Sequence, residues 1–183
     1  MEEKKGEIYH EKQKLQFCLL HALNNLYQEK NVFTKTDLNT IANELIHEDP
    51  VKKSQNNWIP IFKPHHNSLT GNYDINVLIS ALESKGKKVV WHDRRNPASS
   101  INFNDGNSNK LMGFVINVTL KRFGGLWRSR HWVAVRKVDG VWYNLDSDFK
   151  CPYEFKDLDE LKEFLDYIIG GGGEVLLVMN ETD

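Results

Sequence analysis

The chain has 183 residues, and its 24 Lys and Arg side chains against 25 Asp and Glu give a formal net charge of −1. This balance argues against a general nucleic-acid binder, which usually carries a strong basic excess. No apolar run approaches the roughly 20 residues of a membrane span, and the charged start MEEKKGEIYHEKQ is no secretory signal. We therefore expect one cytoplasmic domain over residues 1–183, with reduced thiols at Cys18 and Cys151.

Helical patterns dominate the first half of the chain. Apolar side chains recur at helical spacing over residues 18–28, so the first helix is expected to begin at Cys18. A second helix is expected to open at Thr34, with Asp37 three residues later as its capping partner. A third helix ends at Gly86, where glycine can terminate a helix.

The second half is dominated by strand patterns. An Asp-Gly pair between two alternating runs is the strongest short-range signal for a β-hairpin. The expected elements are strands at 88–91, 111–120, 131–138, 141–147 and 174–179, a loop at 121–130 and a helix at 157–168. Helices followed mainly by strands predict an α+β fold around a mainly antiparallel sheet.

The expected hairpin brings a histidine and a carboxylate together. If Asp139-Gly140 is a two-residue turn, Val135 faces Asn144, and His131 and Asp146 become diagonal neighbours on one face, about 7–8 Å apart at the backbone. A carboxylate so placed can hold an imidazole in one tautomer and stabilise its charged form. A longer turn or a bulge would flip one strand, and a purely structural hydrogen bond is the alternative.

Cys18 is a candidate nucleophile because the positive end of a helix dipole stabilises a thiolate. The alternative is a small core side chain, since free cysteines are often buried. An early Cys followed far downstream by His and then Asn or Asp is the order of papain-like enzymes. Gln13, five residues before Cys18, is a candidate oxyanion donor; otherwise it is a solvated surface residue.

Five segments together resemble the Josephin domain of deubiquitinating cysteine proteases. They are HEKQ at 10–13, QFCLLHALNNL at 16–26, GNYDINVLISAL at 71–82, HWVAVRK at 131–137 and WYNLDS at 142–147. The similarity runs from about residue 9 to residue 179 and fits the short, stand-alone Josephin proteins better than the ataxin type. It implies a papain-like cysteine protease fold, with N-terminal helices and a helical arm packed on a mainly antiparallel sheet.

The resemblance also implies a reaction and a set of roles. By position, the nucleophile falls on Cys18, the general base on His131, the third residue on Asp146 and the oxyanion donor on Gln13. The ataxin type has Asn where this chain has Asp146. The implied reaction is hydrolysis of the bond after the C-terminal glycine of ubiquitin, by a monomer whose partners are ubiquitin or ubiquitinated proteins, with no cofactor and no metal. The alternatives are a non-catalytic ubiquitin-binding module and a papain-like peptidase or amidase with an unrelated substrate.

Other residues have weaker claims on the site. Trp58 and Ile61 fall in the Pro-broken segment at 48–71, which we expect to be a partly helical, mobile excursion matching the arm of Josephin domains, so they either contact ubiquitin or pack under the arm. The loop at 121–130 is expected to be a solvated face that could gate the site. Cys151 is expected to be a structural or exposed thiol.

Overall fold

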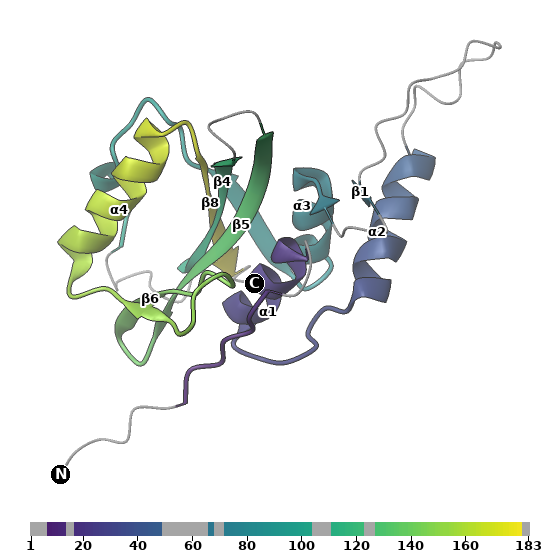
Figure 1. The fold of residues 1–183 in the computed structure, drawn as a ribbon, viewed down its shortest axis with the longest axis horizontal. Helices are drawn as coiled ribbons and strands as arrows, with labels where there is room; N and C mark the ends of the chain where they lie inside the picture. Colours follow the sequence, from purple (N-terminus) through teal and green to yellow (C-terminus); the bar gives the residue numbers. More distant parts are fainter. Residues whose placement is uncertain are drawn as a thin grey trace.

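A six-stranded antiparallel sheet forms the centre of the protein (Figure 1). The computed structural model describes residues 7–13, 17–48, 66–67, 72–103, 111–122 and 127–180. In spatial order the strands are β3 (Lys87–Trp91), β8 (Glu174–Asn180), β4 (Leu111–Arg122), β5 (Trp127–Val138), β6 (Val141–Asn144) and β7 (Tyr153–Glu154). A separate antiparallel pair consists of β1 (His66–Asn67) and β2 (Asn72–Tyr73).

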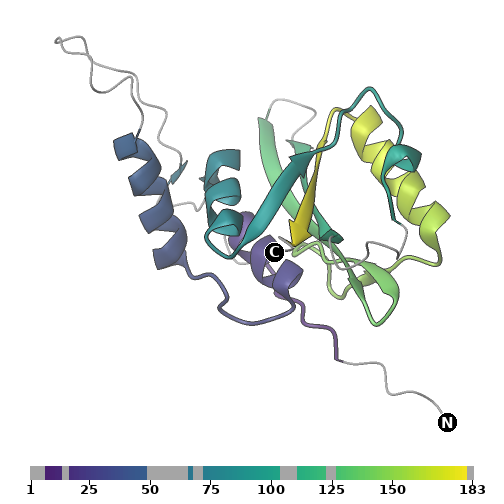
Figure 2. The same cartoon turned by 180° about the vertical axis from the view of Figure 1, so that it is seen from behind.

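Helices cover both faces of this sheet. On one face lie α1 (Cys18–Tyr27) and α3 (Ile75–Glu83), and on the other lies α4 (Leu158–Gly170), next to a short 3-10 turn at Ala98–Ser100. The remaining helix, α2 (Lys35–Glu48), packs on α3 at a distance from the sheet (Figure 2). The predicted α+β class is thereby confirmed. Within the described residues, no helix is both long and apolar enough to span a membrane.

Short-range side-chain hydrogen bonds define where three of the helices begin. Thr34 and Asp37 cap α2 reciprocally, because the backbone N–H of each donates to the side chain of the other, at 2.7 and 3.3 Å. Asp74 and Asp157 are the N-caps of α3 and α4, and each carboxylate accepts two backbone N–H groups of the first turn. Such caps satisfy N–H groups that have no partner within the helix.

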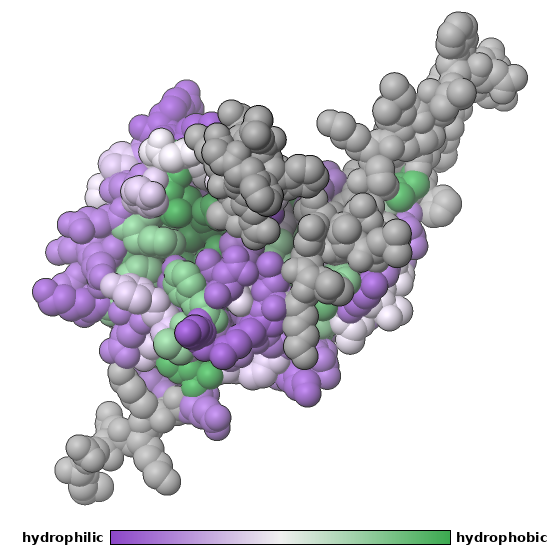
Figure 3. Space-filling view, viewed as in Figure 1, coloured by the Kyte–Doolittle hydropathy of each residue, from purple (hydrophilic) through white to green (hydrophobic). Residues whose placement is uncertain are grey.

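Two apolar layers hold the helices on the sheet. The layer under α1 and α3 contains the fully buried Leu19, Leu23, Leu26, Leu78, Val115 and Ala134. The layer under α4 contains Phe114, Ile116, Val135, Leu161 and Leu165, and apolar atoms are visible between α4 and the strands in Figure 3. Phe114, Val115 and Ile116 alternate between the two layers, so this part of β4 is continuously apolar because both of its faces are covered.

Gly113 on β4 lies against both the neighbouring strand β5 and helix α1. A Cβ atom at Gly113 would lie 2.5 Å from the Val135 carbonyl oxygen and 2.9 Å from Leu26 Cδ1. A side chain at this position would therefore require the β5 backbone to move, and not only the flexible end of Leu26. Gly113 thus lies where α1 meets the strands that carry the rest of the site.

The β5–β6 hairpin has the predicted register. Val138 pairs with Val141 and Val135 with Asn144, and both turn residues have positive φ, 48° at Asp139 and 83° at Gly140. This backbone is the two-residue turn whose twist matches that of the strands.

The predicted loop at 121–130 is wrong at both ends. β4 continues to Arg122 and β5 begins at Trp127, with Thr119 paired to Arg130 and Lys121 to Arg128. Charged side chains and two glycines favour a loop, but the long ladder between the two strands supplies backbone hydrogen bonds that outweigh this local preference. Residues 123–126, with Gly124 and Gly125, lie outside the described residues. So does most of the excursion at 48–71, including Trp58 and Ile61; only Glu48 and His66–Asn67 of it are described.

Candidate active site

Cys18 is the first residue of α1, and only 5% of its surface is exposed. The helix is anchored below it by Leu19 and Leu23, which are completely buried. The N-cap, Phe17, provides no side-chain hydrogen bond to the first turn. Phe17 therefore leaves these N–H groups uncapped, and N–H groups at a helix N-terminus can bind an anion beside the Cys18 sulfur.

His131 and Asp146 form a direct hydrogen bond. His131 lies on β5, 3% exposed, and its Nε2 donates to Asp146 Oδ1 over 2.6 Å. Asp146 lies two residues beyond β6, where Leu145 still donates its N–H to the Ala134 carbonyl over 2.8 Å. The hairpin thus brings the two side chains into contact, as its register predicts.

The environment of His131 favours its protonated form. Burial alone lowers the pKa of this imidazole, but hydrogen bonds and charge interactions with Asp146 and Cys18 outweigh it and raise the pKa to about 10. Because Nε2 is bound to Asp146, Nδ1 is the ring nitrogen left for the thiol. An imidazolium between a carboxylate and a sulfur is the arrangement that activates a cysteine nucleophile.

Gln13 lies beside this group, on an extended segment next to the loop that follows Asp146. Its backbone N–H donates to the Ser147 carbonyl over 2.8 Å, and the Ser147 hydroxyl lies 3.5 Å from Gln13 Oε1. The side chain is half-buried rather than a fully solvated surface group. The structure therefore brings all four predicted residues to one region: Cys18, His131 and Asp146 in direct interaction, and Gln13 through Ser147.

Comparison with known proteins agrees with this geometry. The family model described as "Josephin" matches residues 13–179. The chain is 59% identical to a "Josephin-like protein" of Arabidopsis thaliana over 91% of its own length and 46% of that protein, so it spans less than half of this relative. It is 37% identical to "Josephin-2" of Mus musculus over 95% of its own length and 87% of that protein.

The chain belongs to the Josephin family. A more distant relative is the "Ataxin-3 homolog" of Arabidopsis thaliana, 29% identical over 94% of this chain and 59% of that protein. The family is one of ubiquitin-related cysteine proteases with a papain-like α+β fold.

Several residues that support this Josephin site carry no obvious sequence signal. His10 Nε2 donates to the Asp146 carbonyl over 2.9 Å, and the backbone N–H of Asp148 donates to Asp146 Oδ1 over 2.9 Å. Asn25 binds both the N-terminal segment and the Leu145 carbonyl. One clue was available: Asn25 follows Cys18 by seven residues, two helical turns, so both lie on one face of α1. Its polar side chain there is an exception in a helix that is otherwise largely apolar.

His21 and Cys151 have surroundings that differ from those of Cys18. His21 Nδ1 contacts Glu11 Oε2 at 2.7 Å, so it binds the N-terminal segment. Cys151 is exposed, consistent with its predicted role as a structural or exposed thiol. Neither has the carboxylate and imidazole that surround Cys18.

One group in the described residues has the composition of a metal site. Ligand atoms of His131, Asp146 and Asp148 lie within 4.8 Å of one another. However, His131 Nε2 donates a proton to Asp146, and a ring nitrogen that carries a proton has no lone pair for a metal. The geometry fits proton chemistry better than coordination, and the absence of a metal requirement stays a prediction.

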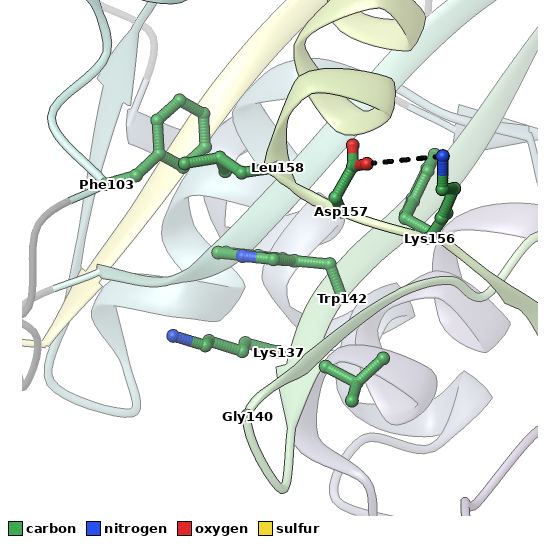
Figure 4. A pocket seen from close by; sticks show the side chains of 9 residues that line it. Phe103, Lys137, Gly140, Trp142, Lys156, Asp157 and Leu158 are labelled. Carbon is green, nitrogen blue, oxygen red and sulfur yellow. Dashed lines mark ion pairs between the residues drawn. The ribbon is translucent and has the colours of Figure 1, made fainter.

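Two hollows among the described residues are not lined by Cys18. A cavity of about 290 Å³ lies at the turn end of the β5–β6 hairpin, with Trp142, Phe103 and Leu158 around it and the Lys156–Asp157 ion pair at its edge (Figure 4). It includes none of the four predicted site residues. A binding surface for a large protein need not be a deep cavity, because interfaces between proteins are broad rather than concave.

Proposed function

We propose that this Josephin chain is a deubiquitinating thiol protease that hydrolyses the isopeptide or peptide bond after the C-terminal glycine of ubiquitin. The observation that carries the proposal is the position of the His131 ring, which interacts with the Asp146 carboxylate at one nitrogen and with the Cys18 thiol. Membership of the Josephin family supports ubiquitin as the substrate class.

The first half-reaction forms a thioester. Cys18 transfers its proton to His131 and attacks the glycine carbonyl carbon as a thiolate. The tetrahedral oxyanion is stabilised by the Gln13 side-chain amide and the Cys18 backbone N–H. The carbon–nitrogen bond then breaks, and His131 donates the proton that it took from Cys18 to the departing amine, which is a lysine amine when the bond is an isopeptide.

The second half-reaction releases ubiquitin. His131, now neutral, accepts a proton from water, and the hydroxide equivalent attacks the thioester carbon. The carbon–sulfur bond breaks, and the proton on His131 returns to the thiolate. Asp146 holds the imidazole in one tautomer throughout, and stabilises its charge in both steps.

Ubiquitin or ubiquitinated proteins are the partners in this proposal. The enzyme acts as a monomer in the cytoplasm, as a single domain over residues 1–183 and without a cofactor or metal.

A ubiquitin probe with a thiol-reactive group at its C-terminus tests this function. We expect wild-type protein and Cys151→Ala to be labelled equally, because Cys151 is exposed and is not among the groups that interact with His131. Cys18→Ala should not be labelled, and it should not release a fluorescent amine from the ubiquitin C-terminus.

The alternatives give other results. A non-catalytic ubiquitin-binding module would bind ubiquitin without labelling or turnover. A peptidase with an unrelated substrate would react at Cys18 with a small alkylating agent but not with the ubiquitin probe. Either result, or labelling of Cys18→Ala, would overturn the proposal.

A further inference from the structure

The N-terminal segment from Tyr9 to Gln13 is held against α1 by side-chain amides. Gln28 Oε1 accepts the Tyr9 N–H over 3.1 Å, and Gln28 Nε2 donates to the Tyr9 carbonyl over 3.0 Å. Asn25 does the same two residues later: its Oδ1 accepts the Glu11 N–H over 2.6 Å, and its Nδ2 donates to the Glu11 carbonyl over 3.2 Å. We call residues 9–13 the strap.

The opposite side of the strap binds the loop that carries Asp146. His10 donates to the Asp146 carbonyl, and the Gln13 N–H donates to the Ser147 carbonyl. Tyr9 and Glu11 thus bind Gln28 and Asn25 on the α1 side, whereas His10 and Gln13 bind the loop. Within the described residues, the strap is therefore hydrogen-bonded both to α1 and to the loop that carries Asp146.

Asn25 is the point where the three parts meet. Besides its two bonds to Glu11, its Nδ2 donates to the Leu145 carbonyl over 3.0 Å, one residue before Asp146. The side chain is completely buried, at 0% exposed. An amide has two donors and an acceptor in a fixed plane, and here each makes a bond to the main chain of a segment that carries a site residue.

We propose that Asn25 is a positioning residue for the hydrolysis proposed above. It fixes the strap that carries Gln13 and the loop that carries Asp146 to the helix that begins with Cys18. Gln13 can then bind the oxyanion of the same carbonyl group that the Cys18 sulfur attacks, while His131 interacts with that sulfur. This inference rests on the proposed function for its kinetic readout, but not for its geometry.

Loss of the Asn25 hydrogen bonds should slow the chemical step of the reaction. A misplacement of about 1 Å in a catalytic group can slow a reaction on the order of 100-fold. Asn25→Ala removes three hydrogen bonds, so we expect kcat on a ubiquitin substrate to fall on the order of 10- to 100-fold. KM should change little, since Asn25 is buried and does not reach the surface that would bind ubiquitin.

Asn24→Ala is the matched control. Asn24 is the neighbouring amide on α1, 2% exposed, and it binds the Phe33 backbone in both directions, at 3.2 and 3.0 Å. Its contact with the strap is confined to the Glu11 carboxylate, at 3.3 Å. We expect a comparable fall in melting temperature, because both variants lose buried hydrogen bonds, but a much smaller change in kcat.

A double-mutant cycle separates positioning from simple loss of stability. If Asn25 acts through Gln13, the variant with both Asn25→Ala and Gln13→Ala should lose less activity than the product of the two single losses. Fully multiplicative losses, or a folded Asn25→Ala with wild-type kcat, would overturn the proposal.

Gln28→Gly provides a second test if Asn25→Ala does not fold. Gln28 has φ of 58°, which glycine adopts without strain, and the substitution removes the bonds to Tyr9. We expect a several-fold lower kcat that is again less than multiplicative with Gln13→Ala. An additive free-energy loss, or none, would count against the strap and hence against Asn25.

The alkylation rate of Cys18 by iodoacetamide distinguishes this inference from the proposed function. It requires no ubiquitin and reports the Cys18–His131–Asp146 group alone. If wild-type protein does not cleave a ubiquitin substrate, the proposed function is wrong. The positioning role still predicts an altered pH profile of alkylation in Asn25→Ala but not in Asn24→Ala; identical profiles would refute it.

Discussion

At the scale of single residues, the Asp146 carboxylate is already oriented before any substrate binds. Its Oδ1 accepts from His131 Nε2 and from the Asp148 N–H, and the Asp146 N–H donates to Asn144 Oδ1 over 3.0 Å. His10 holds the Asp146 carbonyl. A carboxylate fixed in this way stabilises the imidazolium without reorganising during the reaction.

Replacing the charge at Asp146 should change the pH profile more than the maximum rate. Asn can still accept the His131 hydrogen bond, but it has no negative charge, and an opposite charge within about 4–6 Å shifts a pKa by about 1–3 units. In Asp146→Asn the alkaline limb of kcat/KM should therefore move to lower pH by about 1–3 units. The profile is measured from pH 5 to 10.

Asp148→Asn is the control for this experiment. The Asp148 carboxylate lies 3.8 Å from His131 Nε2, and 42% of its side chain is exposed. Exposed charges are screened by water and salt, so its alkaline limb should move by less than about half a unit. Equal shifts in both variants would mean that the two carboxylates contribute alike.

Gln13 should affect the transition state rather than the binding of ubiquitin. Loss of one oxyanion donor costs about 100- to 1000-fold in kcat in other hydrolases. We expect Gln13→Ala to lower kcat to a similar degree, with KM within about threefold. Lys12→Ala, the exposed neighbour, should behave as wild type in the same steady-state assay. A raised KM with unchanged kcat would instead assign Gln13 to substrate binding.

At the scale of elements, what could be predicted from the sequence depends on the range of the interactions. The Thr34–Asp37 cap and the Asp139-Gly140 turn involve residues at most three apart, and both have the predicted geometry. The strap joins residues 14 to 136 positions apart through side chain–main chain bonds, which no local pattern encodes. The strand ends at 121–130 were missed because the ladder between β4 and β5 outweighs local composition.

Substitution of glycine by alanine should have opposite effects on stability at Gly140, in the hairpin turn, and at Gly170, at the end of α4. Gly140 has φ of 83°, a region that costs other residues about 1–2 kcal/mol, although a Cβ there would meet no atom within 4 Å. Gly140→Ala should therefore lower the free energy of unfolding by about 1–2 kcal/mol. Gly170, at the end of α4, also has open space around it, and Gly170→Ala should be neutral or stabilise by up to about 1 kcal/mol.

Urea unfolding of both variants tests this pair. Destabilisation by Gly170→Ala of the same size as by Gly140→Ala would show that the loss does not come from positive φ. The turn sets the hairpin register and with it the contact between His131 and Asp146. The folded fraction of Gly140→Ala keeps this register, so it should still react with the ubiquitin probe.

At the scale of the whole molecule, the site joins parts of the chain that the sheet and α1 bring together. Gln13 and Cys18 come from the N-terminal region, whereas His131 and Asp146 come from the hairpin more than 100 residues later. The spacing predicted the pairing within the hairpin, and the resemblance to a family supplied the rest. The close contacts of Gly113 with the Val135 backbone and with Leu26 join residues far apart in the sequence and could not be predicted from either half alone.

The interaction of His131 with Asp146 should make the free energy of unfolding depend on pH. The pKa of His131 is raised in the folded protein to about 10, above the 6.5 or so of an unfolded histidine. Its bound proton therefore favours the folded state, fully below about pH 6.5, and this contribution is lost as the pH rises towards 10. Asp146→Asn lowers the pKa of His131 in the folded protein and should therefore remove part of this contribution to stability.

We therefore expect the difference in unfolding free energy between wild type and Asp146→Asn to be largest near pH 6 and to shrink by about 1–4 kcal/mol by pH 10. Groups that titrate over this range without contact to His131 or Asp146 are common to both proteins and cancel in the difference. Urea unfolding at pH 6, 8 and 10 measures it, with Asp148→Asn as the comparison in which the gap should stay nearly constant. A gap for Asp146→Asn that does not change with pH would mean that His131 holds no extra proton in the folded protein, and the thiolate–imidazolium pair would lose its electrostatic basis.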